Sequence, residues 1–467
     1  MARRIQIALT VLVLAALSCQ AAAKSLQPGK QSDPKILSHA IQRATRTPLP
    51  SATATITPQP ATATPIPPTA TATWTVTPTA APGDAGLQQR VFEALWAAIQ
   101  QDYLYPDYNG LNWDEIFDEY SARIEEGLSD QAFYLEMEEL VSRLNDEHSV
   151  FLGPVEALDE DSEYSGENDY VGIGVLTSLV AERRRLTIIA VFHDSPAEAA
   201  GIQVHDSILA VDGTPIVGDE GFRRNLLRGP EGSNIELTIQ TPGQQPRQVR
   251  VTRSRVTGSV PIDYTQLASL QGKRVGYILL PTFADDTVDD QFRTALENLS
   301  ADGPLDGLVL DNRQNSGGAD SVARNILGYF VRGNMGYFID RDQQKRAFNI
   351  LGADIQGSSS LPIVVLVGPN TASFGEIFAG VLRDNGRAVI IGEPTEGNIE
   401  VLWRYDFEDG SRAWIARETF RPLQNPDQDW ELTGIIPDQV VPANWDEHTL
   451  DTDPAVKAAL LFIDSLK

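Results

Sequence analysis

The amino-acid sequence predicts a multidomain α/β protein built from three kinds of folded segment. Between residues 86 and 152, apolar residues recur at three- and four-residue steps, which is the period of an amphipathic helix. Between residues 171 and 241, short β-branched runs are separated by Gly and Pro turns, as in a small β domain. After Val260, buried strands alternate with helices, which is typical of an α/β domain with a covered sheet.

The first residues have the pattern of an export signal. Residues 1–23 start with a positively charged end and continue into an apolar stretch at 5–17, which is too short for a comfortable membrane span. The single cysteine, Cys19, ends this stretch in a context that resembles a bacterial lipobox, with Ala16 in place of the usual leucine. We expect an extracytoplasmic protein of the bacterial surface or envelope, with a lipid on Cys19 as its membrane anchor. An ordinary signal peptide cut near residues 21–23 is the alternative.

Composition restricts which partners, cross-links and bound groups the chain can have. Residues 24–85 are expected to be a disordered linker, because their Thr/Pro-rich part cannot bury enough apolar surface to fold. A formal net charge of -27 disfavours nucleic acid as a partner, since no basic stripe could neutralise phosphates. One cysteine rules out disulfides within the chain. No zinc-binding motif is present, so we expect neither a metal nor a cofactor.

The folded part divides into three expected domains. A helical N-terminal domain covers 86–155, a β-rich module covers 156–258, and an α/β domain covers 259–467. In the β-rich module the expected strands are 171–176, 186–191, 207–211 and 235–241. In the last domain we expect strands at 275–280, 307–311 and 361–367, helices at 287–299, from about 319, at 373–383 and at 454–466, and a hairpin at 403–414.

The β-rich module resembles a PDZ domain. The match consists of residues 194–202, residues 206–213 and the loop formed by Gly172, Ile173, Gly174 and Val175. This loop corresponds to the carboxylate-binding loop of the family, and its glycines leave backbone N–H groups exposed for a chain-terminal carboxylate. A bound peptide would add a strand beside the loop. The resemblance implies polypeptide partners, recognised through free C-termini or through internal segments.

The segment 371–380 carries the strongest catalytic signal. It follows the buried strand expected at 361–367 and begins a helix, which places Ser373 at a strand-to-helix turn. At such a turn the hydroxyl is lifted clear of the sheet, and N–H groups without intrahelical partners can bind an oxyanion. From this pattern alone, a helix N-cap is the competing role for Ser373.

The catalytic half resembles the C-terminal processing peptidases and the related tricorn-core proteases. The matching stretches are 276–283, 307–318, 371–380 and 392–397, which together with the PDZ module span nearly all of 86–467. The resemblance implies a catalytic domain of the ClpP/crotonase-like type. It also implies an exported serine endopeptidase that cleaves polypeptides through a Ser373 acyl-enzyme.

The general base is where the sequence departs from the best-known members. Those members carry a lysine at the position held here by Asn398, and an amide cannot accept the serine proton at neutral pH. The other lysines of the folded part are poorly placed: Lys273, Lys345, Lys457 and Lys467. We therefore predict that a Ser–Lys dyad is absent and that a histidine acts as base.

The resemblance to tricorn-core proteases points to one histidine. Those relatives place their catalytic histidine after an N-terminal helical segment, as His148 stands here, and a glutamate shortly before a stretch like 434–438. Glu431 occupies that position, and Glu400 is the runner-up acid. The expected triad is Ser373, His148 and Glu431, with Glu431 orienting the imidazole. A solvated helix end for His148 and a surface turn for Glu431 are the alternatives.

Backbone groups are expected to bind the oxyanion. The candidates are the N–H of Phe374 and one from Gly317 or Gly318, because a glycine pair permits close approach to the tetrahedral intermediate. The rival function is a catalytically inactive pseudoprotease that binds peptides through its PDZ module, which Asn398 suggests. The sequence predicts no oligomeric state.

Overall fold

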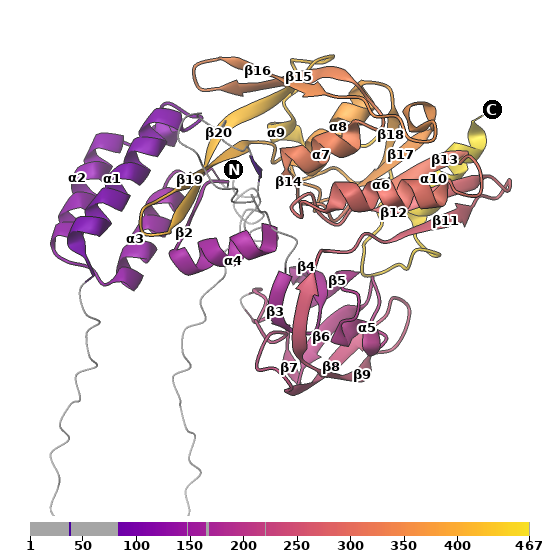
Figure 1. The fold of residues 1–467 in the computed structure, drawn as a ribbon, viewed down its shortest axis with the longest axis horizontal. Coiled ribbons are helices and arrows are strands. Elements are labelled where there is room, and N and C mark those ends of the chain that lie inside the picture. Colours follow the sequence, from indigo (N-terminus) through magenta and orange to yellow (C-terminus); the bar gives the residue numbers. More distant parts are fainter. Residues whose placement is uncertain (1–36, 39–82, 147, 165–167, 220, 467) are drawn as a thin grey trace, which may run out of the picture.

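The computed structural model describes residues 37–38, 83–146, 148–164, 168–219 and 221–466. The predicted signal segment with Cys19 and nearly all of the predicted linker lie outside the described residues. The helical segment, the α/β domain and the PDZ module occupy separate regions of the ribbon (Figure 1). Among the described residues, no helix combines the length and the apolar character needed to cross a membrane.

The N-terminal segment is helical, as predicted, and each helix has a local reason to start. Its elements are α1 (Ala85–Asp102), η1 (Tyr108–Gly110), α2 (Trp113–Glu125), α3 (Asp130–Ser142) and α4 (Pro154–Tyr164). Asp84 caps α1 by accepting from the N–H groups of Gly86 and Leu87. Phe92 of α1 and Trp414 of the catalytic half belong to one continuous apolar core. The helical segment therefore shares its core with the α/β domain.

The PDZ module is a curved antiparallel sheet with short helices. Its elements are β3 (Asn168–Gly172), β4 (Val175–Val180), η2 (Ala181–Arg183), β5 (Arg185–Val191), α5 (Pro196–Ala199), β6 (Ser207–Val211), β7 (Thr214–Pro215), β8 (Asn234–Gln240), β9 (Arg247–Thr252) and β10 (Ser254–Gly258). The main sheet has the order β4-β5-β6-β8-β9, while β3 pairs with β10. The strand predicted at 171–176 is wrong as one strand. Gly174, with φ +81°, turns the chain between β3 and β4.

The catalytic half contains the covered, largely parallel sheet that the sequence predicts. Its strands are β11 (Tyr264–Ala268), β12 (Arg274–Leu279), β13 (Gly307–Asp311), β17 (Ile363–Val367), β18 (Ala388–Gly392) and β21 (Gln439–Val440), in the order β11-β12-β13-β17-β18-β21. Its helices are α6 (Val288–Leu299), α7 (Asp320–Leu327), α8 (Phe374–Asp384), α9 (Trp430–Thr433) and α10 (Pro454–Ser465). Val365 packs into the core that holds α8, whereas Val364 faces the cluster built on α10. Both faces of the sheet are thus covered.

A second, antiparallel sheet joins the catalytic half to the helical segment. It contains β15 (Gly333–Asp340), β16 (Lys345–Ile350), β19 (Val401–Asp406) and β20 (Arg412–Pro422), with β2 (Val150–Leu152) added to β20. Phe151 lies opposite Ala413 in this pairing. The hairpin β19–β20 was predicted, but β15 and β16 were not. Among the short elements, β1 (Leu37–Ser38) pairs with β14 (Gly318–Ala319), and η3 covers Ser358–Ser360.

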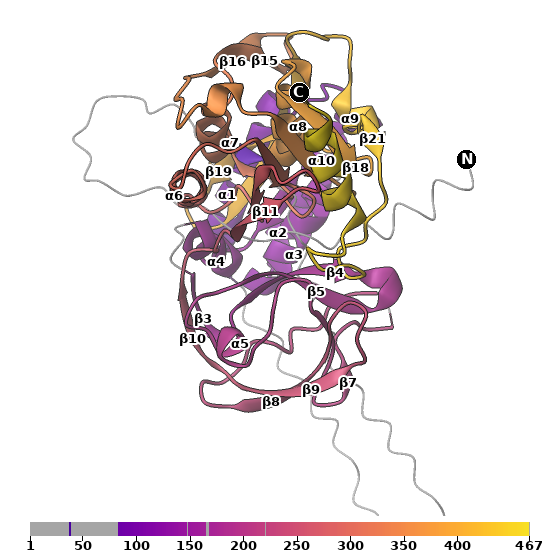
Figure 2. The ribbon, with the colours of Figure 1, turned by 90° about the vertical axis from the view of Figure 1, so that its right-hand side faces the viewer.

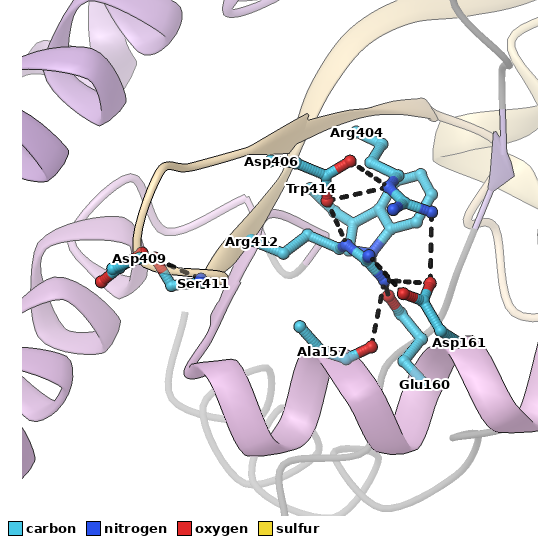
Figure 3. A network of polar contacts seen from close by, with 9 residues as sticks. All are labelled: Ala157, Glu160, Asp161, Arg404, Asp406, Asp409, Ser411, Arg412 and Trp414. Carbon is cyan, nitrogen blue, oxygen red and sulfur yellow. Dashed lines mark hydrogen bonds and ion pairs between the residues drawn. The ribbon is translucent and has the colours of Figure 1, made fainter. Parts of the chain in front are cut away.

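A buried ion cluster fastens α4 to the β19–β20 hairpin (Figure 3). Arg412 pairs with Glu160 and Asp161 of α4 and with Asp406 of β19, and its side chain is only 3% exposed. Trp414 Nε1 donates to Glu160 Oε1 at 2.9 Å. Removing one partner of a buried ion pair leaves an uncompensated charge, so such clusters hold elements firmly in place. This cluster and the pairing of β2 with β20 together fix the chain on the C-terminal side of His148.

The PDZ module docks on the catalytic half through β4, β5 and a nearby loop, as both views show (Figures 1 and 2). The His205 ring stacks on Trp445 with centroids 4.0 Å apart. Trp445 Nε1 donates to the carbonyl of Ile188 in β5 at 3.1 Å. Ser178 Oγ of β4 accepts from Asn370 Nδ2 at 3.2 Å. Because Asn370 lies three residues before Ser373, the PDZ module touches the loop that carries the predicted nucleophile.

Candidate active site

Ser373 stands at the sharp turn between β17 and α8. It occupies the N-cap of α8 with φ +55° and ψ -128°, a strained backbone conformation for a residue that has a side chain. The loop after β13 supports the turn, since Asn315 accepts from the Ala372 N–H through its carbonyl at 3.1 Å. Ser373 is 1% exposed, and its Oγ has no hydrogen-bond partner among the described residues. Strain of this kind is kept where surrounding structure enforces it, often at functional sites.

The buried side chain of Glu376 supports the turn at Ser373 through hydrogen bonds. One of its carboxylate oxygens accepts from the N–H groups of Ser373 at 3.2 Å and Asn398 at 2.8 Å. The other accepts from the N–H of Gly397 at 2.9 Å and from the Thr395 hydroxyl. Burial raises the pKa of Glu376 to about 7, although these hydrogen bonds oppose the shift. Glu376 was not among the residues predicted from the sequence. The Ser-x-x-Glu spacing of a capping box was the signal that could have found it.

His148 is buried between the helical segment and the catalytic half. Asp146 accepts from the His148 N–H at 3.0 Å, and β2 begins two residues later. His148 Nε2 lies 2.9 Å from Glu431 Oε1, while Nδ1 is buried without a partner in the described part of the chain. Burial acts to lower the pKa of His148, but the hydrogen bond to Glu431 and the nearby charge of Glu400 outweigh it and raise the pKa to about 9.

Glu431 is the second residue of α9 and connects the histidine to the turn of Ser373. Its Oε2 accepts from the N–H of Ile399 at 2.7 Å. The preceding residue, Asn398, accepts from the Ser373 N–H at 2.5 Å through its carbonyl. One short piece of backbone thus contacts both Ser373 and Glu431. In the described chain, no hydrogen bond joins Ser373 Oγ to the His148 ring. The structure therefore pairs His148 with Glu431, whereas the hydrogen bond between His148 and Ser373 is not formed.

Glu400 is a second carboxylate beside His148. Its Oε2 lies 3.7 Å from His148 Nε2 and has no hydrogen-bond partner among the described residues. Its other oxygen accepts from the Tyr105 hydroxyl, which comes from the helical segment. Burial raises the pKa of Glu400 to about 7, since the charged form is poorly solvated there. Tyr105 was not singled out by the sequence, because nothing in its local pattern distinguishes it from a core tyrosine.

The lysines within the described ranges are engaged away from Ser373. Lys273 Nζ donates to the carbonyls of Ile463 at 2.8 Å and Leu466 at 2.7 Å. Lys457 donates to a carbonyl of the loop before α10, and Lys345 lies over the ring of Tyr337. The absence of a lysine base stays a prediction.

The expected oxyanion donors near Ser373 differ in whether their N–H groups already have a partner. A Cβ added to Gly317 would lie 2.7 Å from Ser373 Cβ and 3.1 Å from the Phe374 nitrogen, so only glycine permits this approach. The Gly317 N–H donates to Asn315 Oδ1 at 2.9 Å, which occupies it. Phe374 is the first residue of α8, where an N–H has no intrahelical partner. Gly318 is adjacent, in β14.

The predicted carboxylate loop lies at the bend between β3 and β4. Within it, Ile173 is buried and its carbonyl accepts from the Ala197 N–H at 2.8 Å. The carbonyl of Gly174 accepts from the Phe192 N–H at 3.1 Å. The bend starts at Gly172 and ends at Val175, the first residue of β4. Because β4 is at the edge of its sheet, the loop leads into a strand that can accept another.

Family comparisons match the segments described above. The profile of peptidase family S41 matches residues 274–441, that of the PDZ domain matches 171–252, and that of the tricorn protease C1 domain matches 88–142. The first covers the sheet and helix that carry Ser373. The last covers α1 to α3, which agrees with the resemblance to tricorn-type proteases.

Similar proteins of known name cover most of the chain. The carboxyl-terminal-processing protease of Synechocystis sp. is 30% identical over 381 residues, or 80% of this chain and 86% of the relative. Carboxyl-terminal-processing peptidase 2, chloroplastic, of Arabidopsis thaliana is 30% identical over 79% of this chain and 72% of its own. The solved structure of a photosystem II D1 C-terminal processing protease is 28% identical, with a TM-score of 0.55 over 80% of this chain and 97% of that one. This chain therefore belongs to the carboxyl-terminal-processing peptidases of family S41 and is a serine peptidase.

Proposed function

We propose that the chain is an exported serine endopeptidase that uses Ser373, His148 and Glu431 in place of a Ser–Lys dyad. The observation that carries this proposal is the 2.9 Å contact between His148 Nε2 and Glu431 Oε1, with His148 Nδ1 buried and unpaired in the described chain. An imidazole held at one nitrogen by a carboxylate has the other nitrogen ready to accept a proton. The strained Ser373 turn and the amide at position 398 support the same assignment.

In the proposed reaction, Ser373 Oγ attacks a peptide carbonyl and gives its proton to His148 Nδ1. Glu431 stabilises the imidazolium that forms, and the N–H of Phe374, with that of Gly318, stabilises the developing oxyanion. The imidazolium then protonates the leaving amine, and water hydrolyses the Ser373 ester. Approach of the His148 ring to Ser373 Oγ completes the site, since catalytic hydrogen bonds often tighten only when substrate binds.

The PDZ module is proposed to deliver polypeptide ends to this site. Support comes from the position of β4 at the end of its sheet and from the contact between Ser178 of β4 and Asn370, in the loop before Ser373. A peptide added to β4 would lie beside the loop that leads to the nucleophile. Export and a lipid on Cys19 remain part of the proposal and rest on the N-terminal sequence pattern.

Cleavage of an unfolded protein tests the proposal. Purified full-length chain is incubated with casein, and a fluorophosphonate probe reports whether Ser373 reacts as a nucleophile. We expect cleavage together with labelling at Ser373. Casein left intact and Ser373 left unlabelled would favour the peptide-binding pseudoprotease instead.

The activity should require alkaline conditions. His148 accepts a proton only in its neutral form, and its pKa is raised to about 9, so kcat/KM should fall about tenfold for each pH unit below that value. The charge of Glu400 contributes to this rise. Glu400→Gln should therefore move the acidic limb of the pH profile to lower pH, measured with a fluorogenic peptide. A limb that stays in place or moves upward in this variant would contradict the assignment of His148 as base.

A further inference from the structure

Three side chains from distant parts of the chain bring metal-binding atoms together. His148 Nε2, a carboxylate oxygen of Glu400 and one of Glu431 all lie within 4.8 Å of one another. We propose that this cluster, the His–Glu–Glu cluster, binds a zinc ion and that bound zinc reversibly inhibits the peptidase. The inhibition rests on the proposed role of His148 as the base, whereas the binding does not.

The spacing of these atoms suits tetrahedral zinc. Bonds of about 2.0–2.1 Å at tetrahedral angles place neighbouring ligand atoms about 3.3 Å apart. His148 Nε2 lies 2.9 Å from Glu431 Oε1 and 3.7 Å from Glu400 Oε2. These two distances bracket the tetrahedral spacing. The oxygens of Glu400 and Glu431 lie within 4.8 Å of each other, so the ion would draw them together by up to about 1.5 Å. Three protein ligands leave a fourth position for water.

Each carboxylate is already oriented as a ligand that binds through one oxygen. The Tyr105 hydroxyl donates to Glu400 Oε1, and the Ile399 N–H donates to Glu431 Oε2 at 2.7 Å. The remaining oxygen of each carboxylate is the one nearer His148 Nε2. Outer donors of this kind fix ligand orientation in metal sites, and losing one weakens binding.

The buried carboxylate of Glu400 also favours a cation in the cluster. Glu400 is 2% exposed, and its Oε2 lacks a hydrogen-bond partner in the part of the chain that the structure describes. A buried carboxylate oxygen without a partner is costly, and a divalent cation would neutralise the charge of Glu400 and Glu431 together. The Glu431 side chain is 18% exposed, so the cluster is accessible from solvent.

The ligand set selects zinc over the common hard cations. One imidazole nitrogen with two carboxylate oxygens suits zinc, whereas magnesium and calcium prefer six or more oxygen ligands. The sequence predicts no metal, because it has no zinc motif with ligands at short spacing. These ligands lie up to 283 residues apart and meet only in the folded chain.

Zinc on Nε2 would block the proposed base. In the neutral base the single ring hydrogen is on Nε2, where Glu431 accepts it; zinc bonds to Nε2 in its place, and this hydrogen moves to Nδ1 through solvent. The neutral ring then carries its hydrogen on Nδ1, which can donate to Ser373 Oγ but cannot accept from it. A chelator that removes the ion would restore the acceptor.

Direct titration tests the binding without relying on activity. Tag-free full-length chain, stripped with a chelator, is titrated with zinc chloride in competition with a chromophoric chelator. We expect one zinc per chain, bound at least about tenfold more weakly by Glu400→Gln. His193→Ala is the matched control, since His193 lies outside the His–Glu–Glu cluster, 3.4 Å from Glu198, and its loss should leave the affinity unchanged.

Tyr105→Phe guards against a folding artefact. It keeps all three ligands and removes only the donor to Glu400, so zinc affinity should fall by a smaller factor, with thermal unfolding confirming the fold. Zinc affinity that is the same in wild type, Glu400→Gln and Tyr105→Phe would overturn the proposal, as would the lack of a saturable site.

The titration also separates this inference from the proposed function. A chain that binds one zinc through Glu400 but never cleaves casein would retain the metal site and lose the peptidase proposal. A chain that cleaves casein but has no zinc site would do the reverse. In an active chain, zinc should suppress casein cleavage, and the chelator should restore it.

Discussion

Replacing Ser373 by alanine should abolish peptide cleavage while leaving the fold intact. Loss of the nucleophile from a serine protease lowers kcat/KM by about 10⁴-fold or more, with only transition-state binding left to act. The substitution should change the free energy of unfolding by no more than about 1 kcal/mol, because Ser373 Oγ makes no hydrogen bond within the described chain. Kinetic assays with a fluorogenic peptide and a thermal unfolding curve measure the two effects.

Ser373→Ala also separates the two roles considered for Ser373, nucleophile and helix cap. Should the variant cleave as fast as the parent, the observed hydrolysis would come from a contaminant or another nucleophile. A large drop in stability would instead show that Ser373 acts mainly as the cap of α8, the alternative left open by the sequence.

Replacing His148 by alanine should cost nearly as much activity as replacing Ser373. Without the base, the hydroxyl is a poor nucleophile, and losses of about 10⁴-fold or more are expected. Glu431→Gln should cost about 10³–10⁴-fold, because the amide cannot stabilise the imidazolium and favours the wrong tautomer. Lys345→Ala should be neutral, since Lys345 lies over Tyr337. The assay is the same fluorogenic cleavage, at a pH near 9.

The pattern across these variants identifies the base. Activity that survives in His148→Ala but not in Ser373→Ala would remove the histidine from the mechanism. Activity lost in Lys345→Ala would reopen the search for a lysine. Glu400→Gln, by contrast, should retain more activity than Glu431→Gln, because Glu431 makes the 2.9 Å contact and Glu400 lies 3.7 Å away.

The differences between the predicted and the observed fold have local causes. The strand predicted at 171–176 is split because Gly174 adopts φ +81°, a conformation that a periodicity count does not register. The hairpin formed by β15 and β16 was missed, since its burial depends on packing against β20 and not on a strong alternation of its own.

The sequence by itself determined the fold class, the position of Ser373 and the PDZ module. These depend on patterns that are local in the chain, namely a buried strand followed by a turn and a helix, and a glycine-containing loop before a strand. Only the tertiary structure decided which acid contacts His148, because Glu431 lies 283 residues away in the chain. The pairing of β2 with β20 holds the segment next to His148 against the catalytic half. The same docking brings Tyr105 and Glu400 together, which no sequence spacing could indicate. Burial then raises the pKa of Glu400 and leaves one of its oxygens without a partner among the described residues, so the chemistry of the His–Glu–Glu cluster arises from packing.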